Sequence, residues 1–448
     1  MFQTKRHVSK LGHNSALSAF TKWRRVGSLV PVLVSGAALT AVSGPTYAAS
    51  LCVNASASSG CMATIGAAVA AASSGDTVNV APGTYKESVT IGKPLSLIGA
   101  DATKVTIDAT GLGVGIYVDG NDNKALTGVF ISGFTVQNAN FEGILVTGAS
   151  GITISGNIVQ KNNQGLVTAA AGATCPNIPA YDSSEGEDCG EGIHLNGVTH
   201  SVIANNTSQN NSGGILISDD DGATHDNVIT GNVVMNNLAA CGITLASHPP
   251  ATLTGSSAPL GVYNNSIIGN TITGNGANGT GAGAGIFASV PGAAAYSNAV
   301  INNILTGNGL PGVTMHSHTP GQTLTGNIVI GNTISGDAAD TEDAATPGTA
   351  GINVFGVSSI AGTIIAQNTI SQEAFDVVVN GPGTVNVQRN TLTAGTGVAN
   401  LTTGAVNADG NWWGCNDNPT FPISGFAGCS GTSGAVSVSV WAAGAIVK

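Results

Sequence analysis

The chain has 448 residues, of which only 8% are charged and 4% aromatic, and its formal net charge is −11. Residues 1–48 hold 6 of the 13 Lys and Arg and none of the 24 Asp and Glu, so the rest has 7 basic against 24 acidic residues, a net charge of −17. This balance argues against nucleic acid, anionic membranes and polyanionic substrates as partners.

The first 48 residues have the pattern of a signal peptide. A basic region reaches Arg25, an apolar stretch of 14 residues follows at 26–39, and Thr46-Tyr47-Ala48 fits a cleavage site. Pro31 and Gly36 interrupt the apolar stretch, which is too short to cross a membrane easily. We therefore expect an exported monomer, in the periplasm, at the cell surface or outside the cell, with no membrane span in its mature chain.

Two short phrases repeat through the rest of the chain. Gly-Ile-x-Leu recurs with variations at Gly192, Gly242, Gly285, Gly312 and Gly351, and Gly-Asn-x-Ile/Val alternates with it. The shortest gap between successive second phrases, Asn368 to Asn390, is 22 residues. Such a period without helical segments predicts a solenoid whose strands stack in parallel about 4.8 Å apart. We expect one all-β domain at residues 49–448, a right-handed parallel β-helix.

Both open ends of a solenoid must be covered. Residues 65–72 are the one good helix candidate and predict a short capping helix within an N-terminal cap at 49–75. Coils are expected at about 76–410 and a C-terminal cap at 411–448. In that cap Trp412 and Trp413 are interpreted as a hydrophobic cover over the last coil, with sugar stacking on exposed indoles as the alternative.

Asparagines form two columns when the repeats are aligned. Asparagine tolerates the corner conformation, and stacked amides bond to one another along the axis, so both columns are interpreted as structural ladders. The first column comprises Asn157, Asn206, Asn232, Asn270, Asn303, Asn332, Asn368 and Asn390. The second comprises Asn227, Asn265, Asn298 and Asn327, each five residues before its partner.

Seven cysteines fit an exported protein. Three pairs are close in sequence and are disulfide candidates: Cys52 with Cys61, Cys175 with Cys189, and Cys415 with Cys429. The pair Cys175–Cys189 would close the loop between Thr168 and Gly190. Cys241 is left over immediately before a core strand, which favours a buried free thiol.

The stretch from Gly75 to Gly99 resembles the opening coil of right-handed parallel β-helix proteins with the pectin-lyase fold. It reads Gly75-Asp76-Thr77-Val-Asn-Val-Ala-Pro82-Gly83-Thr84-Tyr85, then Ser88-Val-Thr-Ile and Pro94-Leu-Ser-Leu-Ile-Gly99. The later repeats are similar to the parallel β-helix repeats of the same superfamily, over roughly residues 62–415. This resemblance implies the fold but no single activity, because the superfamily includes polysaccharide lyases, hydrolases and epimerases, pectin esterases, surface proteins and a periplasmic copper-binding maturation factor.

Polar residues gather at the turn that follows each Gly-Ile-x-Leu strand. Because coils stack in register, these turns must share one edge of the solenoid. Outward strand positions hold His194, Thr244, Asn196, Ser218 and His316, and the turn beyond holds Asp219, Asp220, Asp221, His225, His248 and His318. Asp220 and His248 belong to adjacent coils and should lie about 5 Å apart, with His318 about 10 Å away, two coils further.

This edge predicts a catalytic or metal site. Asp220, His248, His316, His318 and His194 are candidates for general acid–base catalysis. Asp219, Asp220, Asp221 and His225 are candidates for holding a divalent cation, calcium or zinc. The simpler alternative is that Asp-Asp-Asp-Gly only forms a turn and His248 only caps a loop. The acidic loop at 337–343 follows a different strand and is expected to be solvated and not catalytic.

The motifs of known activities in this superfamily are absent. The edge has no Lys or Arg base of the lyase kind, no Gly-His-Gly or Arg-x-Lys of the polygalacturonase-like hydrolases, and no Asp-Pro-His-Asp of the alginate epimerases. Two classes therefore stay open. One is a carbohydrate-active enzyme whose partner is a polysaccharide or cell-surface glycan. The other is a non-catalytic extracellular binding or structural protein, with periplasmic metal handling as a further option.

Overall fold

A computed structural model of the chain describes residues 48–164, 189–249, 260–277, 279–341, 345–415 and 429–446. They belong to one compact unit, Ala48–Lys448. Residues 1–47 of the expected signal peptide at 1–48 lie outside the described residues. No helix in the described ranges is both long enough and apolar enough to span a bilayer.

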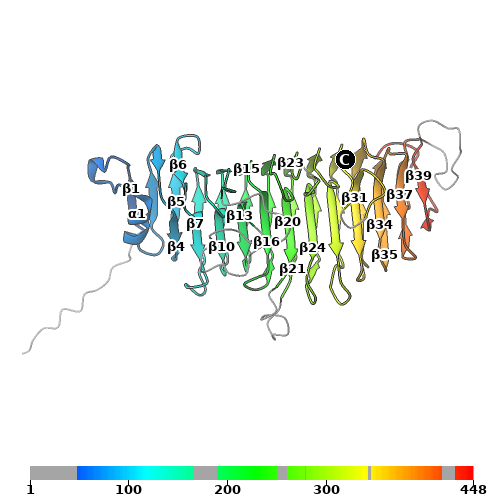
Figure 1. Ribbon diagram of the computed structural model, residues 1–448, viewed down its shortest axis with the longest axis horizontal. Helices are drawn as coiled ribbons and strands as arrows, with labels where there is room; N and C mark the ends of the chain where they lie inside the picture. The colour runs from blue at the N-terminus through cyan, green and yellow to red at the C-terminus, as the bar shows by residue number, and fades with distance from the viewer. Residues whose placement is uncertain are drawn as a thin grey trace, which may run out of the picture. The chain divides into compact units, whose positions relative to one another are not determined.

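Three long parallel sheets form the sides of the solenoid within the described residues, and most chain turns contribute one strand to each sheet (Figure 1). The first sheet has 14 strands: β1 (Ser50–Val53), β2 (Thr77–Val80), β5 (Ser96–Gly99), β8 (Phe130–Ser132), β11 (Thr153–Ser155), β14 (Val202–Ala204), β18 (Val228–Thr230), β22 (Ser266–Ile268), β26 (Ala299–Ile301), β29 (Ile328–Ile330), β32 (Thr363–Ala366), β35 (Thr384–Gln388), β38 (Ala405–Asn407) and β40 (Val436–Ser437).

The second sheet has 12 strands: β4 (Val89–Ile91), β7 (Val114–Asp119), β10 (Glu142–Thr147), β13 (Glu191–Asn196), β16 (Gly213–Ser218), β20 (Ile243–Ser247), β24 (Ala284–Ala288), β28 (Val313–Ser317), β31 (Ala350–Gly356), β34 (Phe375–Asn380), β37 (Thr396–Asn400) and β39 (Gly431–Ser433). The third has 11 strands: β3 (Gly83–Tyr85), β6 (Val105–Asp108), β9 (Thr135–Gln137), β12 (Ile158–Gln160), β15 (Thr207–Gln209), β19 (Val233–Met235), β23 (Thr271–Thr273), β27 (Ile304–Thr306), β30 (Thr333–Ser335), β33 (Thr369–Ser371) and β36 (Thr391–Leu392).

A short corner sheet joins three neighbouring coils between the second and first sheets. It consists of β17 (Thr224–His225), β21 (Val262–Tyr263) and β25 (Ala295–Tyr296). Every strand pair in the four sheets that connects successive coils is parallel, as in β13–β16–β20. The predicted all-β, right-handed parallel β-helix is confirmed.

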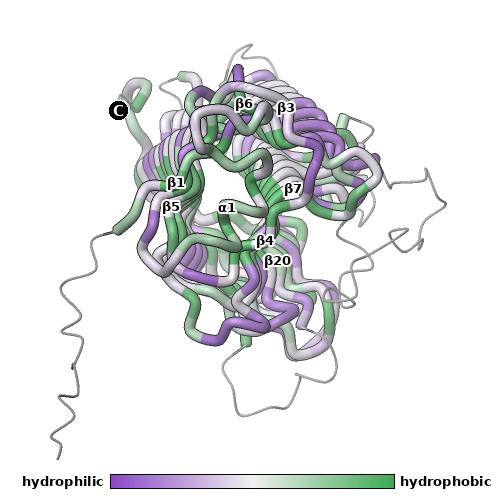
Figure 2. Tube along the Cα trace, turned by 90° about the vertical axis from the view of Figure 1, so that its left-hand side faces the viewer, coloured by the Kyte–Doolittle hydropathy of each residue, from purple (hydrophilic) through white to green (hydrophobic). Residues whose placement is uncertain are grey.

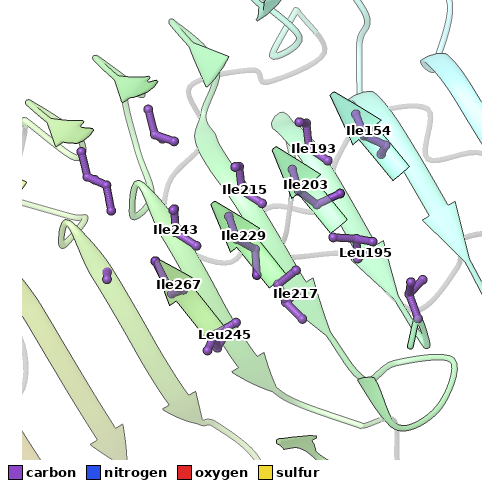
Figure 3. Packing of buried hydrophobic residues seen from close by; sticks show 14 of the residues in the cluster. Ile154, Ile193, Leu195, Ile203, Ile215, Ile217, Ile229, Ile243, Leu245 and Ile267 are labelled. Carbon is purple, nitrogen blue, oxygen red and sulfur yellow. The ribbon is translucent and has the colours of Figure 1, made fainter. Parts of the chain in front are cut away.

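One continuous apolar core fills the inside of the coils. Alternate residues point inward, so Ile193 and Leu195 of β13 stack on Ile215 and Ile217 of β16 and face Ile203 of the first sheet (Figure 3). These side chains are completely buried. Viewed along the coils, the strands of the three long sheets surround this core (Figure 2). Burial in such stacked rows provides the main favourable free energy of folding.

The predicted asparagine ladders are present and buried. In the first, each amide nitrogen donates to the next oxygen, as from Asn232 Nδ2 to Asn270 Oδ1 at 3.0 Å, and Asn411 continues the column at its end. The second runs from Asn227 to Asn327. A third ladder was not predicted, and its residues lie five positions after those of the first: Asn162, Asn211, Asn237, Asn275 and Asn308, followed by Asp337 and Glu373.

The N-terminal end is covered as the sequence predicts. Helix α1 (Ile65–Ala71) packs Ile65, Ala68 and Val69 onto the core and lies across the end of the coil (Figure 2). The Thr64 hydroxyl accepts the Ala67 N–H, which caps the helix. At the other end Trp413 is fully buried in the core, which confirms the predicted apolar cover for this indole.

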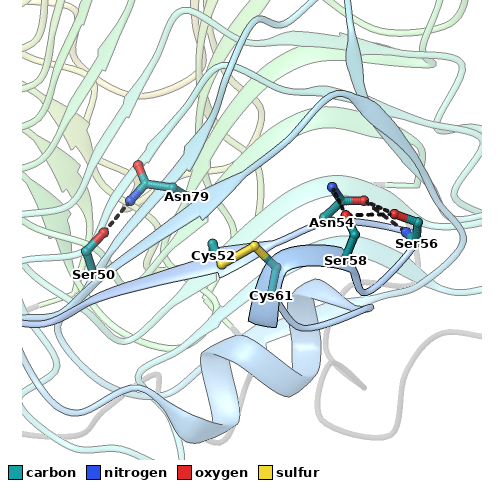
Figure 4. Close-up of a disulfide and its surroundings, with 7 residues drawn as sticks. All are labelled: Ser50, Cys52, Asn54, Ser56, Ser58, Cys61 and Asn79. Carbon is teal, nitrogen blue, oxygen red and sulfur yellow. Dashed lines mark hydrogen bonds between the residues drawn. A yellow bond between two sulfur atoms is a disulfide. The ribbon is translucent and has the colours of Figure 1, made fainter.

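Two of the three predicted disulfides lie within the described residues. Cys52–Cys61 fixes the turn that contains the 3-10 helix η1 (Ser58–Gly60), next to hydrogen bonds of Asn54 with Ser56 and Ser58 (Figure 4). Cys415–Cys429 is also formed. Cys189 is disulfide-bonded, while its predicted partner Cys175 lies outside the described residues. Cys241 is the predicted buried free thiol, and burial raises its pKa to about 11.

Candidate functional site

The outer face of the second sheet carries two polar rows, and strand register fixes which residues share a row. His194 pairs with Leu216, which pairs with Thr244, so these outward side chains succeed one another along the axis. The next row passes from Asn196 to Ser218 and later reaches His316. The outward placement predicted from the Gly-Ile-x-Leu phrase is therefore confirmed for these residues.

Asp220 and His248 meet at the edge where these rows end. Each lies two residues beyond a paired position, Ser218 and Ala246 respectively, so they occupy equivalent places on adjacent coils. His248 Nδ1 is 2.8 Å from Asp220 Oδ1. The Asp220 side chain is 2% exposed and that of His248 19%, so the pair is largely shielded from water. The predicted adjacency of these two residues is confirmed.

The other two aspartates of this turn have different surroundings. Asp219 is fully buried and accepts hydrogen bonds from the Ser247 hydroxyl at 2.8 Å and the His248 N–H at 2.9 Å. Burial raises the pKa of Asp219 to about 6 despite these bonds. Asp221 instead accepts a 2.8 Å hydrogen bond from the Asn121 amide, which belongs to an earlier coil. Asp219 thus positions His248, and Asp221 attaches the turn to the preceding coils.

His194 lies on the sheet face beside this turn and is completely buried. Its Nε2 is 2.8 Å from Ser218 Oγ, and its Nδ1 is 3.5 Å from Glu142 Oε1. These groups succeed one another in the order of a Ser–His–acid triad, from strands β16, β13 and β10. All three side chains are fully buried, so the arrangement presents no nucleophile to solvent in this conformation.

His316 lies further along the same face, and its surroundings correct one expectation. Its Nε2 is 2.9 Å from Asp340 Oδ2, and the Asp340 side chain is 1% exposed. The loop at 337–343 was expected to be solvated, but Asp337 and Asp340 are both buried. Asp337 continues the third ladder, and the chain then reaches the outer face, where Asp340 meets His316. Asp343 lies outside the described residues.

Aromatic rings surround the imidazole of His316. Phe287 and Phe355, which precede and follow His316 in its row, both lie edge-on to it. His318 follows with its ring centroid 5.5 Å from that of His316. His316 also lies within 2.8–3.0 Å of Thr314 Oγ1 and Asn353 Nδ2. The sequence analysis predicted neither Asp340 nor Asn353 as a neighbour of His316. Asp340 lies in the segment that leads to the next coil, and Asn353 lies on a strand of that coil.

His225 is placed away from the aspartates with which it was grouped. It belongs to β17 of the corner sheet, where its ring stacks on Tyr263 and its Nδ1 is 2.7 Å from Asp226 Oδ2. His200 of the previous coil lies beside it, with its Nε2 3.8 Å from the same carboxylate oxygen. His200, His225 and Asp226 are the one group in the described ranges whose three ligand atoms lie within 4.8 Å of one another. The sequence interpretation missed His200 and Asp226.

The parallel sheets and the sequence repeats define the chain as a right-handed parallel β-helix repeat protein. The family described as periplasmic copper-binding protein (NosD) matches residues 69–287. A donor set of two imidazoles and a carboxylate, as in His200, His225 and Asp226, is compatible with copper or zinc.

Solved structures with a similar chain path have low identity to it. An alginate lyase from Paenibacillus sp. is 16% identical with a TM-score of 0.48, and the match covers 87% of this chain and 99% of the lyase. The A-module of a mannuronan C-5 epimerase from Azotobacter vinelandii is 18% identical with a TM-score of 0.36, over 70% of this chain and 90% of the module. An E. coli bacteriophage tailspike protein in complex with a pentasaccharide is 13% identical with a TM-score of 0.46, and the match covers 76% of this chain and 59% of the tailspike chain. No curated protein matches the sequence.

Proposed function

We propose that the protein is exported and acts on a neutral or weakly charged polysaccharide or cell-surface glycan, with Asp220 and His248 as its acid–base pair. The observation that supports this most is the 2.8 Å contact between His248 Nδ1 and Asp220 Oδ1 at the edge of the second sheet. A strongly acidic mature chain disfavours polyanions, while a rigid parallel face suits an extended, repetitive ligand.

The pair has the chemistry that proton transfer needs. A carboxylate that accepts a hydrogen bond from one imidazole nitrogen fixes the tautomer of the ring and raises the basicity of the other nitrogen. Asp219 holds the backbone of His248 in place, so the imidazole is positioned from two sides. In this proposal His248 exchanges a proton with the sugar, Asp220 orients and balances the charge of the imidazole, and Asp219 is a positioning residue.

A panel of neutral and weakly charged polysaccharides tests the proposal. The mature chain, residues 49–448, would be incubated with each glycan, with and without chelator, while new reducing ends and unsaturated products are measured. We expect turnover of at least one glycan, and a fall of about 10²–10⁴-fold in kcat for Asp220→Asn and for His248→Ala. The exposed Asp101→Asn is the matched control and should keep full activity.

Two results would contradict this proposal. The first is turnover that neither substitution at the edge reduces, which would place the chemistry elsewhere. The second is glycan binding without any product, with Asp220→Asn and His248→Ala binding as tightly as the wild type. In that case Asp220 and His248 are not catalytic, and the protein is better described as a non-catalytic extracellular binding protein.

Metal handling is the second candidate function. The match of residues 69–287 to a family described as periplasmic copper-binding supports it, as does the disulfide content expected of an exported protein. The direct test is calorimetry of copper or zinc binding to the mature chain after a chelator has removed bound metal. The two candidate functions use different residues, because Asp220 and His248 are not part of the group His200, His225 and Asp226.

A further inference from the structure

We infer that His200, His225 and Asp226 form a binding site for a divalent transition-metal ion of the zinc or copper(II) type. The three residues, hereafter the corner site, lie where the second sheet turns toward the first. They come from two adjacent coils, since His200 follows the coil of β13 and the other two residues follow that of β16. This inference does not depend on the polysaccharide proposal, which uses a different turn.

The distances between ligand atoms suit a small cation. His225 Nδ1 lies 2.7 Å and His200 Nε2 3.8 Å from Asp226 Oδ2. Ligands at about 2.0–2.1 Å from a tetrahedral zinc ion are separated by about 3.3 Å, which lies between these two values. All three ligand atoms lie within 4.8 Å of one another, so rotations of the side chains can bring them to this spacing. The side chains are 64%, 22% and 40% exposed in the order His200, His225, Asp226, so an ion and a water ligand can reach the site.

The backbone holds two of these ligands at matching corners. Strand register places His200, Asp226, Asn264 and Ser297 at the same corner of four successive coils. All four residues have positive φ, between 53° and 57°. Asparagine is the usual residue in this left-handed conformation, so the corner itself does not require an imidazole or a carboxylate. The next two coils fill the same corner with the neutral residues Asn264 and Ser297, so the two coils of the corner site are the ones with a metal-binding side chain there.

The third ligand is held by an aromatic stack. The ring of His225 lies 4.6 Å from that of Tyr263 with nearly parallel planes, and Tyr263 stacks on Tyr296 at 4.9 Å. His225 thus occupies the first position of a column in which the following coils place tyrosine. Packing of this kind fixes the orientation of the imidazole before any ion binds and lowers the entropy cost of coordination.

Two imidazoles and one carboxylate select the type of ion. Imidazole nitrogen favours zinc and copper, whereas calcium and magnesium prefer sets of oxygen ligands. The Asp219–Asp221 turn, where the sequence predicted a calcium or zinc ion, is less suited. Both oxygens of Asp219 accept hydrogen bonds from the next coil, and Asp221 is bonded to Asn121. A bound ion at the corner site would link two adjacent coils and stabilise the fold by mass action.

Substitutions that copy the neighbouring coils test the inference without disturbing the fold. His200→Asn and Asp226→Asn install the residue found at Asn264, and His225→Tyr installs the one found at Tyr263 and Tyr296. The mature chain, freed of metal with chelator, would be titrated with zinc and with copper(II) by calorimetry near neutral pH. Asp220→Asn is the matched control at the edge of the second sheet.

We expect the wild type to bind one ion per chain, with a rise in Tm. Each single substitution should weaken binding by about 10–100-fold and the triple variant should bind none at this affinity. The copper(II) electron paramagnetic resonance spectrum should show coupling to two imidazole nitrogens, and to one in His200→Asn. Asp220→Asn should bind as the wild type does.

Three outcomes would overturn the corner site. The wild type binds neither ion, the triple variant binds as tightly as the wild type, or binding is lost in Asp220→Asn and kept in the triple variant. In the last two cases the chain still binds metal, so metal handling would survive as a function while this assignment of the ligands would not. Loss of glycan turnover in the Asp220→Asn variant alone has no bearing on the inference.

Discussion

His248 and Asp220 are 28 residues apart in the chain, yet His248 Nδ1 lies 2.8 Å from Asp220 Oδ1 because adjacent coils place them at equivalent positions. A shielded contact of this kind contributes to stability through both partners. We expect Asp220→Asn and His248→Ala each to lower the free energy of unfolding by about 1–3 kcal/mol. The double variant should lose little more than the worse single variant, because the two residues share one interaction.

Urea denaturation of the four proteins in this cycle measures the coupling between Asp220 and His248. The slope of the free energy against urea should be the same in all four, which would show that the fold is retained. Losses in the single variants that simply add in the double variant would show that the two side chains do not interact in solution. The order of the coils at this edge would then need revision.

The acidic end of the third ladder and the neighbouring Asp376 make stability depend on pH. Burial raises the pKa of Asp337 to about 7, that of Glu373 to about 7 and that of Asp376 to about 8. The folded state therefore holds protons that the unfolded chain, with ordinary carboxyl pKa values, has released. The contribution of these three carboxyls to the free energy of unfolding should fall as pH rises from about 4 to about 8 and change little below that range.

Asp337→Asn should remove part of this dependence. Asp337 Oδ1 accepts the N–H and the side-chain amide of Asn308 at 2.8 Å, and an asparagine oxygen can accept the same two bonds. One pKa unit corresponds to 1.36 kcal/mol, so we expect the variant to be more stable than wild type by ~2–4 kcal/mol near pH 8 and about equal near pH 4. Melting curves across this range provide the measurement. Parallel curves for the two proteins would show that Asp337 is not protonated in the fold.

The repeats made most of this fold predictable. Glycine and isoleucine in Gly-Ile-x-Leu fix which residues point inward. Asn232 and Asn270 could be aligned because the successive coils from Asn157 to Asn390 place asparagine at that corner. Register then followed, and with it the contact of Asp220 with His248. The five-residue spacing from Asn332 to Asp337 was also available and would have identified the third ladder.

Residues in irregular segments could not be placed in this way. Asp340 lies in a segment after the repeat that has no counterpart on other coils. Its position therefore could not be aligned, and its contact with His316 was not predictable. The corner site was not predicted for a different reason. His200 was not considered as a site residue, although it directly follows a position that is paired from coil to coil. His225 was grouped by sequence proximity with aspartates on another turn.

Glycines that face the inside of the coils should tolerate no side chain. A Cβ on Gly214 would lie 2.2 Å from the Gly242 carbonyl oxygen and 2.3 Å from Val234 Cγ1. Gly214→Ala should therefore cost about 3 kcal/mol or more, because the backbone of the next coil must move. Gly395→Ala is the matched control, since a Cβ there meets no atom within 4 Å. Comparable melting temperatures for the two variants would contradict the close stacking of coils at Gly214.

The asparagine ladders should be sensitive to single substitutions in their middle. Asn270 Oδ1 accepts bonds from the N–H and side-chain amide of Asn232, and its own amide donates to the Ile229 carbonyl and to Asn303 Oδ1. Asn270→Ala leaves these buried groups without partners, so we expect a loss of about 3–5 kcal/mol at any pH. Asn79→Ala, at an exposed asparagine bonded only to Ser50, should cost less than about 0.5 kcal/mol.

Asn270→Asp distinguishes a ladder from simple packing. A carboxylate retains both acceptor roles of Asn270 but cannot donate to Ile229 or Asn303, and its charge would be buried. The Asp variant should therefore be clearly less stable than wild type near neutral pH. Because protonation restores one donor, it should recover part of that loss near pH 5. The Ala variant should show no such recovery. Equal pH profiles for Asn270→Asp and Asn270→Ala would mean that the amide bonds along this column do not carry the stability assigned to them.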